Sequence, residues 1–168
     1  MQAERSDIFI SVIETNKGII YKVAHAYCIH AEDRKDLIQE IIVQLWKSFN
    51  RYNDEYKYTT WMYRIALNVA ISFYRKENRR KRLTDPLSDN ILDLVEDNAL
   101  IETNKNIGYL NQFIAGLKEL DKALMLLYLE EKSHKEIAEI TGISETNIST
   151  KIGRIKKILK QKFSTIQA

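Results

Sequence analysis

Residues 133–159 read SHKEIAEITGISETNISTKIGRIKKIL, and this stretch decides the fold of the C-terminal half. Ser133 followed by Glu136 is a capping-box pattern, which predicts that a helix begins here. Gly142 predicts the end of that helix, because glycine adopts a left-handed turn at little cost. Ser144 can then cap a second helix. Apolar residues recur at helical spacing on its inner face: Ile148, Ile152, Ile155 and Leu159.

The outer face of the second helix is polar and basic. Two short helices joined by a glycine turn, with such a face on the second, predict a helix-turn-helix that binds DNA. The alternative is an ordinary helical hairpin with a solvated basic face. The cap, the turn glycine and the basic face agree with one another, which favours DNA binding. The residues on this face are Thr146, Asn147, Ser149, Thr150, Lys151 and Arg154.

Length and composition indicate an all-α protein. The chain has 168 residues, enough for one ordinary domain or two small ones, with five glycines and one proline. Its net charge of +3 excludes a generic polycation. A single cysteine, Cys28, excludes an internal disulfide and fits a reducing compartment. No signal peptide or membrane-spanning run is apparent, so we expect a cytoplasmic protein.

Charge changes sign along the chain. Residues 75–82, RKENRRKR, carry six positive charges and one negative, which exceeds what a helix C-terminus needs and predicts phosphate contact. Residues 84–102 then contain six acidic residues, no Lys or Arg and the only proline. This shift predicts a domain boundary. We therefore expect two small helical domains, 1–82 and 105–168, joined by an acidic linker over 83–104.

The N-terminal domain is expected to begin with helices over 4–29 and 33–49. The first reads as two helical segments meeting near Asn16. The second leaves a polar side, Asp36, Gln39 and Glu40, which on pattern alone is a solvated face. The apolar stripe of the first segment is Ile8, Phe9, Val12 and Ile13. That of the helix over 33–49 is Leu37, Ile38, Ile41, Ile42, Leu45, Trp46 and Phe49.

A tyrosine-rich loop over 50–58 precedes another long helix. Its tyrosines, Tyr52, Tyr56 and Tyr58, are suited to stacking on unpaired bases, or to folding back as a lid on the core, and both interpretations stay open. Thr59 or Thr60 is expected to cap the helix that follows. Its inner face is predicted to be Met62, Ile65, Ala66, Val69 and Phe73, with Arg64, Asn68, Ser72, Arg75 and Arg79 off that face.

The remaining helices of the C-terminal half follow the same spacing. One stripe is formed by Ile107, Leu110, Phe113, Ile114 and Leu117. Asp121 is expected to cap the next helix, with Leu124, Leu127 and Tyr128 inward.

Catalytic and metal sites are not expected. His25, Cys28 and His30 are close in sequence, but zinc needs three or four convergent ligands and no second cluster supplies the rest. The sequence also has no glycine-rich phosphate loop and no nucleophile signature. We therefore expect no enzyme activity, no cofactor, no metal and no small-molecule substrate.

Several motifs resemble a known family. Residues 36–40, DLIQE, and 60–68, TWMYRIALN, with the basic tail that follows, resemble region 2 of bacterial sigma factors. Residues 117–159 resemble region 4, although Thr141 stands where the pattern usually has an apolar residue. The short length and the direct connection of the two regions resemble the extracytoplasmic-function (ECF) group.

The resemblance implies a role for each surface. Asp36, Gln39 and Glu40 would dock on the clamp coiled coil of the RNA polymerase beta-prime subunit. The helix-turn-helix would contact the beta-subunit flap and read the upstream, minus-thirty-five promoter element through Thr146, Asn147, Ser149, Thr150, Lys151 and Arg154. Recognition and opening of the downstream, minus-ten element would fall to Tyr52, Trp61, Ile65, Asn68, Arg75 and Arg79. An anti-sigma factor is a further implied partner, beside core polymerase and promoter DNA.

Three functions compete. The first is a sigma factor, the second a stand-alone helix-turn-helix regulator, and the third a small enzyme. The regulator does not account for the motif-rich N-terminal half, and the enzyme lacks a site. The sequence therefore favours a sigma factor.

Overall fold

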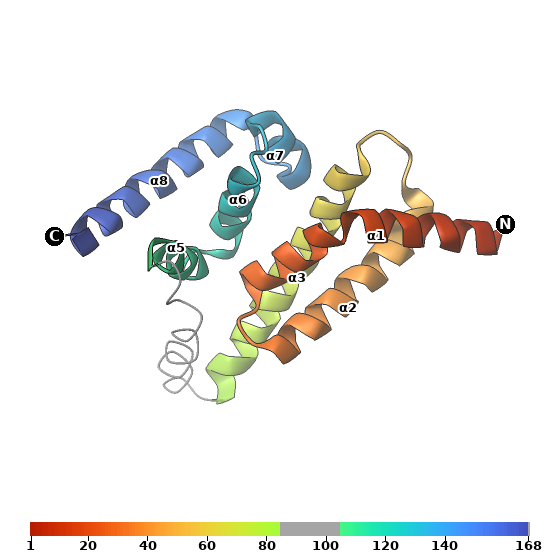
Figure 1. Ribbon diagram of the computed structural model, residues 1–168, viewed down its shortest axis with the longest axis horizontal. Helices are drawn as coiled ribbons and strands as arrows, with labels where there is room; N and C mark the ends of the chain where they lie inside the picture. Colours follow the sequence, from red (N-terminus) through yellow and green to blue (C-terminus); the bar gives the residue numbers. More distant parts are fainter. Residues whose placement is uncertain (85–104, 168) are drawn as a thin grey trace. The chain divides into compact units, whose positions relative to one another are not determined.

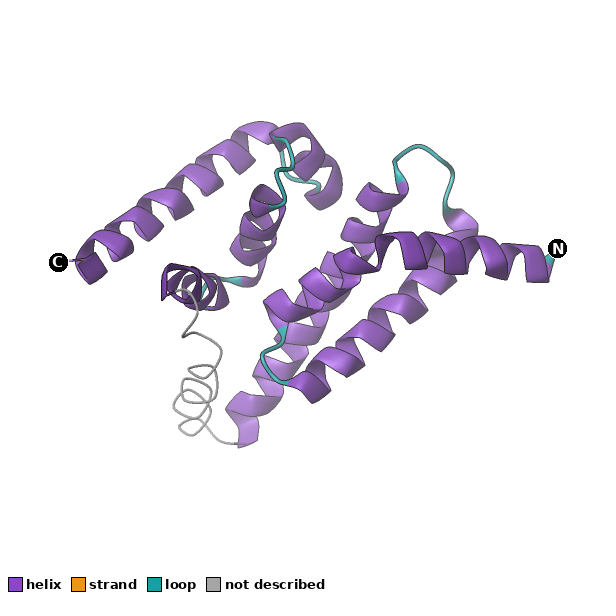
Figure 2. Ribbon diagram, viewed as in Figure 1, coloured by secondary structure: helices purple, strands orange, loops and turns teal. Residues whose placement is uncertain are grey.

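The computed structural model describes residues 1–84 and 105–167, and every element within these ranges is helical (Figures 1 and 2). The predicted all-α fold class is confirmed. The chain divides into two compact units, Met1–Arg75 and Lys76–Ala168. Most of the expected acidic linker, 85–104, lies outside the described residues, and the domain boundaries expected from the sequence stay predictions. None of the described helices is long and apolar enough to cross a membrane.

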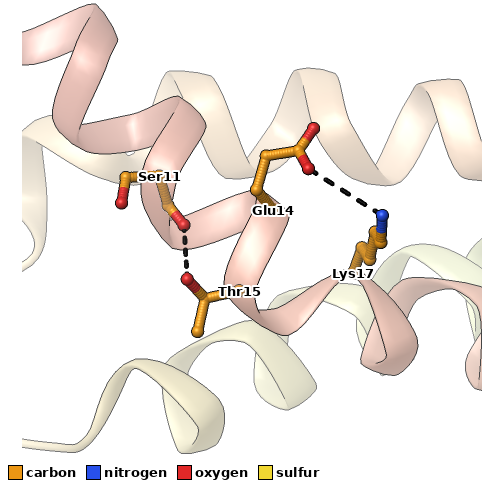
Figure 3. A network of polar contacts seen from close by, with 4 residues as sticks. All are labelled: Ser11, Glu14, Thr15 and Lys17. Atoms are coloured by element: carbon orange, nitrogen blue, oxygen red, sulfur yellow. Dashed lines mark hydrogen bonds and ion pairs between the residues drawn. The ribbon is translucent and has the colours of Figure 1, made fainter.

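Helix α1, Gln2–Tyr27, is kinked at Asn16, whose φ of −118° and ψ of 15° are not helical. The side-chain amide of Asn16 donates a hydrogen bond to the Val12 carbonyl at 2.9 Å, which competes with the backbone ladder. Neighbouring side chains also bond locally (Figure 3). The Thr15 hydroxyl donates to the Ser11 carbonyl at 2.8 Å, and Glu14 pairs with Lys17 at 3.8 Å. The expected meeting of two helical segments near Asn16 is confirmed.

Helix α2, Ala31–Ser48, packs beside α1 and continues into a short 3-10 turn, η1, Phe49–Arg51 (Figure 1). Two residues expected in the core are exposed: Ile8 to 48% and Trp46 to 37%. Phe9, one position after Ile8, takes the inward direction, since successive helical residues point about 100° apart. The core of the two helices is formed by Ile20, Val23, Ala24, Leu37, Ile41 and Leu45.

Helix α3, Tyr58–Thr84, begins before the expected threonine cap. The Lys57 carbonyl accepts the first helical bond from the Trp61 N–H at 3.1 Å, and Thr60 is buried instead of capping. The inner face is also shifted by part of a turn from the prediction. Ile65, Val69 and Phe73 are only half-buried. The buried residues are Met62, Tyr63, Ala66, Leu67 and Ala70.

The C-terminal unit contains α5 (Lys105–Ala115), α6 (Glu119–Leu129), α7 (His134–Thr141) and α8 (Glu145–Gln167). Helix α6 packs against the other three, and α7 packs against α8. The core is aliphatic, as the helix-turn-helix pattern predicts. Its buried side chains are Leu124, Met125, Leu127, Ile137, Ile140, Ile148, Ile152 and Ile155.

Two expectations for this unit are wrong. Asp121 does not cap α6, because the helix begins at Glu119 after Lys118; Asp121 lies within the first turn, where negative charge favours the helix dipole. Ile107 is 55% exposed and is not part of the α5 stripe. The buried residue of α5 is Gly108, so the helix approaches its neighbours on a side that Ile107 does not share.

Candidate nucleic-acid and partner-binding surfaces

The turn between α7 and α8 has the geometry that the sequence predicts. The Ser133 hydroxyl accepts from the Glu136 N–H at 3.1 Å, and the Glu136 carboxylate accepts from the Ser133 N–H at 2.8 Å. Gly142 follows with φ +76°, in the left-handed region. Thr141 bonds in both directions. Its hydroxyl donates to the Ile137 carbonyl at 2.7 Å and accepts from the Ile143 N–H at 3.3 Å, so a polar residue before the glycine supports the turn.

Helix α8 separates its core from its outer surface. The Ser144 hydroxyl accepts from the Asn147 N–H at 3.3 Å and caps the helix, as expected. Ile148, Ile152 and Ile155 are buried on the inner side. The predicted DNA-facing residues lie on the other side, where Thr146, Asn147, Ser149, Thr150 and Arg154 are exposed and Lys151 is half-buried.

The polar groups of this outer surface are not equally available. The Thr150 hydroxyl donates to the Thr146 carbonyl at 3.0 Å, so its hydrogen is already used. Within the described part of the chain, the Asn147 side-chain amide has no hydrogen-bond partner. An asparagine amide can pair with adenine through two hydrogen bonds. Further along α8, Lys151 and Arg154 line an open hollow of about 270 Å³ together with Lys118.

The main feature of the N-terminal unit is a ring cluster that joins α1, α2, η1, the tyrosine-rich loop and α3. Phe9 meets Trp46 edge-on, with ring centres 5.0 Å apart, and Phe49 at 5.3 Å. Phe49 lies 6.1 Å from Trp61. These separations and tilts are those that aromatic pairs prefer. The ring cluster consists of Phe9, Trp46, Phe49, Tyr52, Tyr58 and Trp61.

Two of the three loop tyrosines, Tyr52 and Tyr58, pack back within the ring cluster, the second of the two alternatives that the sequence left open. Tyr52 stacks on Tyr58 with ring centres 4.3 Å apart, and its hydroxyl donates to the Tyr56 carbonyl at 2.6 Å. All three rings stay half-buried rather than enclosed. Partial burial, and then the nearby Asp54 carboxylate, raise the pKa of Tyr52. A neutral tyrosine therefore forms this contact.

The predicted downstream DNA residues on α3 lie along one side of the helix and are called the α3 strip below. Trp61, Ile65, Asn68, Arg75 and Arg79 follow each other at spacings of four, three, seven and four residues. Asn68 and the two arginines are exposed, and Ile65 and Trp61 are half-buried.

Arg64 also lies near this strip, although no motif in the sequence assigned it a role. It is exposed, and its guanidinium lies 5.2 Å from the Tyr56 ring centre. The signal in the sequence was an arginine less than two turns into the helix that begins at the last of the three tyrosines. A cation held over an aromatic ring is fixed in direction.

On α2, Asp36, Gln39 and Glu40 are all exposed on the side away from the core, as predicted. These residues form the α2 face. Glu40 accepts a hydrogen bond from the Gln44 side-chain amide at 3.0 Å. Val43, which no motif in the sequence singles out, is 43% exposed and lies on the same side, three residues after Glu40.

The three residues considered for a metal are used differently. His25 Nδ1 is 2.9 Å from the Tyr21 carbonyl, and Cys28 is buried. Within the ranges that the structure describes, no three His, Cys, Asp or Glu side chains come together as a metal site would require.

Comparison with known proteins shows which family the chain belongs to. The model of Sigma-70 region 2 matches residues 12–80, and that of Sigma-70 region 4 matches residues 107–159. RNA polymerase sigma factor SigZ of Bacillus subtilis is 31% identical over 127 residues, which cover 75% of this chain and 70% of that protein. The chain belongs to the sigma-70 family of sigma factors.

Within that family the chain belongs to the ECF group. ECF RNA polymerase sigma factor SigW of Bacillus subtilis is 25% identical over 165 residues, covering 92% of this sigma factor and 88% of that one. A solved structure of the sigma factor RpoE, in complex with the anti-sigma factor NepR from Bartonella quintana, shares the fold with a TM-score of 0.66. It is 15% identical and covers 95% of this chain and 96% of that chain.

In this sigma factor the α2 face and the α3 strip lie within region 2, and the helix-turn-helix lies within region 4. The first two turns of α1 precede the matched part of region 2.

Proposed function

We propose that this sigma factor binds core RNA polymerase in the cytoplasm and directs it to specific promoters, where transcription begins. The observation that carries the proposal is the order of the two modules: region 2 with its ring cluster, then region 4 with its capped recognition helix. A chain that only bound duplex DNA would need the second module alone. The chain acts by binding, and its binding energy favours the opened promoter.

Region 4 reads the minus-thirty-five element as duplex. The N-terminal end of α8, with Thr146 and Asn147, enters the major groove, as the second helix of such motifs does. Ser149 and Thr150 follow on the same exposed surface. Lys151 and Arg154 hold phosphates, because basic side chains beside the reading surface contact the DNA backbone and fix the register of the helix.

Region 2 reads the minus-ten element as it opens. Asn68 offers an amide to the edge of an unpaired base, next to Ile65 and Trp61 on the α3 strip. Tyr52 extends this surface from the loop. Arg75 and Arg79 contact the backbone two and three turns beyond Asn68 on α3, where positive charge adds affinity without reading sequence.

Protein partners occupy other surfaces. Asp36, Gln39 and Glu40, with Val43 beside them, dock on the beta-prime clamp, and region 4 contacts the beta flap. The RpoE structure contains an anti-sigma factor by its title. We propose that an anti-sigma factor also holds this chain until a signal releases it.

Two binding measurements test the proposal. The first is the affinity of the full chain for purified core polymerase, which we expect to be specific and lost in a competition with another sigma factor. The second is binding to a promoter duplex with and without core. Tight binding to duplex by the chain alone, with no affinity for core, would mean that it is a stand-alone regulator.

A further inference from the structure

The first two turns of α1 form one wall of an open hollow of about 360 Å³ in the N-terminal unit. This wall contains Glu4, Arg5 and Ile8, all of which precede residue 12, where the match to region 2 begins. The opposite wall contains Tyr52 and Tyr58 of the ring cluster. The hollow therefore combines a surface already proposed to face DNA with a segment that has no assigned role.

The apolar surfaces of the hollow suit a flat ring. Tyr52 and Tyr58 are stacked on one another, with 21° between their planes. Ile8 is 48% exposed and has no place in the core. Unpaired bases stack on tyrosine regardless of their sequence, because every base has a π face. The volume is at the lower end of the range for small-ligand sites, about 300–1,000 Å³.

The charges show which part of a nucleotide fits. Glu4 and Asp54 place two carboxylates in the lining, and these repel phosphate but accept hydrogen bonds from the N–H groups of a base edge. Arg5 is the cationic side chain in the lining, beside Met1, and its guanidinium lies 5.3 Å from the Trp46 ring centre and 5.9 Å from that of Phe49. The positive charge of Arg5 is thus directed at the rings. The hollow therefore suits a base better than a phosphate.

Asp54, which carries one of these carboxylates, also has an uncommon backbone conformation. Asp54 has φ +59°, in the left-handed region that non-glycine residues seldom adopt. Asp is among the residues that tolerate this conformation best, so the loop holds an acidic side chain where glycine would have been easier.

We propose that this hollow holds one unpaired base of the opened promoter strand, with Glu4 and Ile8 of α1 contacting it. The proposal rests on the proposed function, because it requires an opened promoter. It adds a second base site to the one assigned to Trp61, Ile65 and Asn68, with Tyr52 bordering both sites, and it gives the start of α1 a part in recognition.

The test is an abasic scan of a forked promoter bound by core polymerase and the full chain. Single-stranded positions of the non-template strand are replaced by abasic sites one at a time, and affinity is measured for each. Wild type is compared with Glu4→Ala and Ile8→Ala. Asp7→Ala is the matched control, because Asp7 is an exposed acid one turn away that does not line the hollow.

One position should behave differently from the rest. With wild type, an abasic site there should weaken binding roughly five- to a hundredfold, the range measured for base–aromatic stacking. Glu4→Ala and Ile8→Ala should weaken binding to the intact fork and should shrink this abasic effect. Asp7→Ala should bind as tightly as wild type or tighter, since it removes a negative charge near DNA, and should keep the full effect.

Other outcomes contradict the proposal. If Glu4→Ala tightens binding as Asp7→Ala does, and all profiles match wild type, the hollow holds no base, while the sigma activity stands. If the α1 variants shrink the abasic effect at the position that responds to Asn68→Ala, there is a single base site and no second one. If wild type with core does not bind the fork, the proposed function fails and this inference with it.

Discussion

The helix-turn-helix and the ring cluster differ in how they divide stability and DNA binding among their residues. On α8, Ile148, Ile152 and Ile155 hold the fold from one side, and Asn147 and its neighbours face outward from the other. The residues that stabilise the fold and the residues proposed to contact DNA are therefore separate sets. In the ring cluster, Tyr52 and Trp61 belong to both sets, because each packs on other rings and each is proposed to face DNA.

This difference has a physical reason. Reading paired bases in a groove requires a rigid helix that carries small polar groups, and an aliphatic core under the helix provides that rigidity. Holding unpaired bases requires flat apolar surfaces, and the same surfaces pack on each other when no base is present. Recognition and stability should therefore be separable in region 4 and coupled in region 2.

The largest expected effect is on the core of region 4. Ile148→Ala should lower the free energy of unfolding by about 2–5 kcal/mol, because Ile148 is fully buried and its loss leaves a cavity. Urea denaturation of this variant beside Thr146→Ala, an exposed neighbour two residues earlier, gives the measurement. If both variants were equally stable, the inner and outer sides of α8 would be wrongly assigned.

Trp61→Ala tests the coupling in region 2. It should lower stability by about 2 kcal/mol, through lost contacts with Phe49, Tyr52 and Tyr58, and should also reduce promoter opening. Asn68→Ala, on the same strip but exposed, should change stability by less than about 0.5 kcal/mol and still reduce opening. Thermal unfolding together with permanganate footprinting of opened thymines measures both quantities. A Trp61→Ala variant that opens promoters normally would contradict the coupling of recognition and stability in region 2.

Asn147→Ala tests the separation in region 4. It should cost about 1–3 kcal/mol of discrimination at one base pair of the minus-thirty-five element, with stability unchanged to within about 0.5 kcal/mol. Thr150→Ala should cost less, because the Thr150 hydroxyl already donates to its own helix. Promoter-library selection with holoenzyme supplies the preferences. A shift in the preferred minus-ten sequence would contradict the separation.

The α2 face should behave like α8, with binding separate from folding. The double change Gln39→Ala and Glu40→Ala should weaken core polymerase binding roughly tenfold, the loss of one or two interface hydrogen bonds. Stability should stay the same, since both side chains are exposed. Lys35→Ala is the control on the same helix. Equal core affinity for the double variant and wild type would exclude this face from the interface.

The smallest effect concerns the Tyr52 hydroxyl. Tyr52→Phe should lower stability by about 1 kcal/mol at neutral pH, through loss of the bond to the Tyr56 carbonyl. The pKa of Tyr52 is raised in the folded state, so its contribution is complete below the unfolded pKa of 10.0 and is lost as the pH rises through the folded pKa. Denaturation curves above pH 10.0 should therefore converge for the two proteins. A difference that grew with pH would mean that the hydroxyl makes another contact.

Local signals in the sequence predicted region 4 closely. The capping box at Ser133, the turn at Gly142 and the cap at Ser144 each depend on a few adjacent residues, and each has the expected geometry. The cap of α6 was misjudged, because Asp121 suits both a cap and a first turn. Burial of Ile107 was also misjudged, since it depends on which side of α5 meets its neighbours.

Region 2 was predicted less closely, because its surface depends on contacts between distant segments. Trp46 and Phe9 are far apart in sequence, and only the fold shows that they form one ring cluster with Trp61. The same holds for Arg5 over Trp46, which no spacing indicates. The roles that resemblance assigns to Asp36, Asn68 and Asn147 are compatible with their exposure and stay predictions.

Run-off transcription with purified core polymerase measures the proposed sigma activity itself. Templates carrying candidate promoters are transcribed by core alone, by core with wild type, and by core with Asn68→Ala or Asn147→Ala. Wild type should produce transcripts of defined length that core alone does not. A pre-opened downstream bubble should restore the Asn68→Ala activity and leave the Asn147→Ala defect in place. If wild type adds no specific start site, or if the bubble rescues both variants alike, the division of labour between the two regions is wrong.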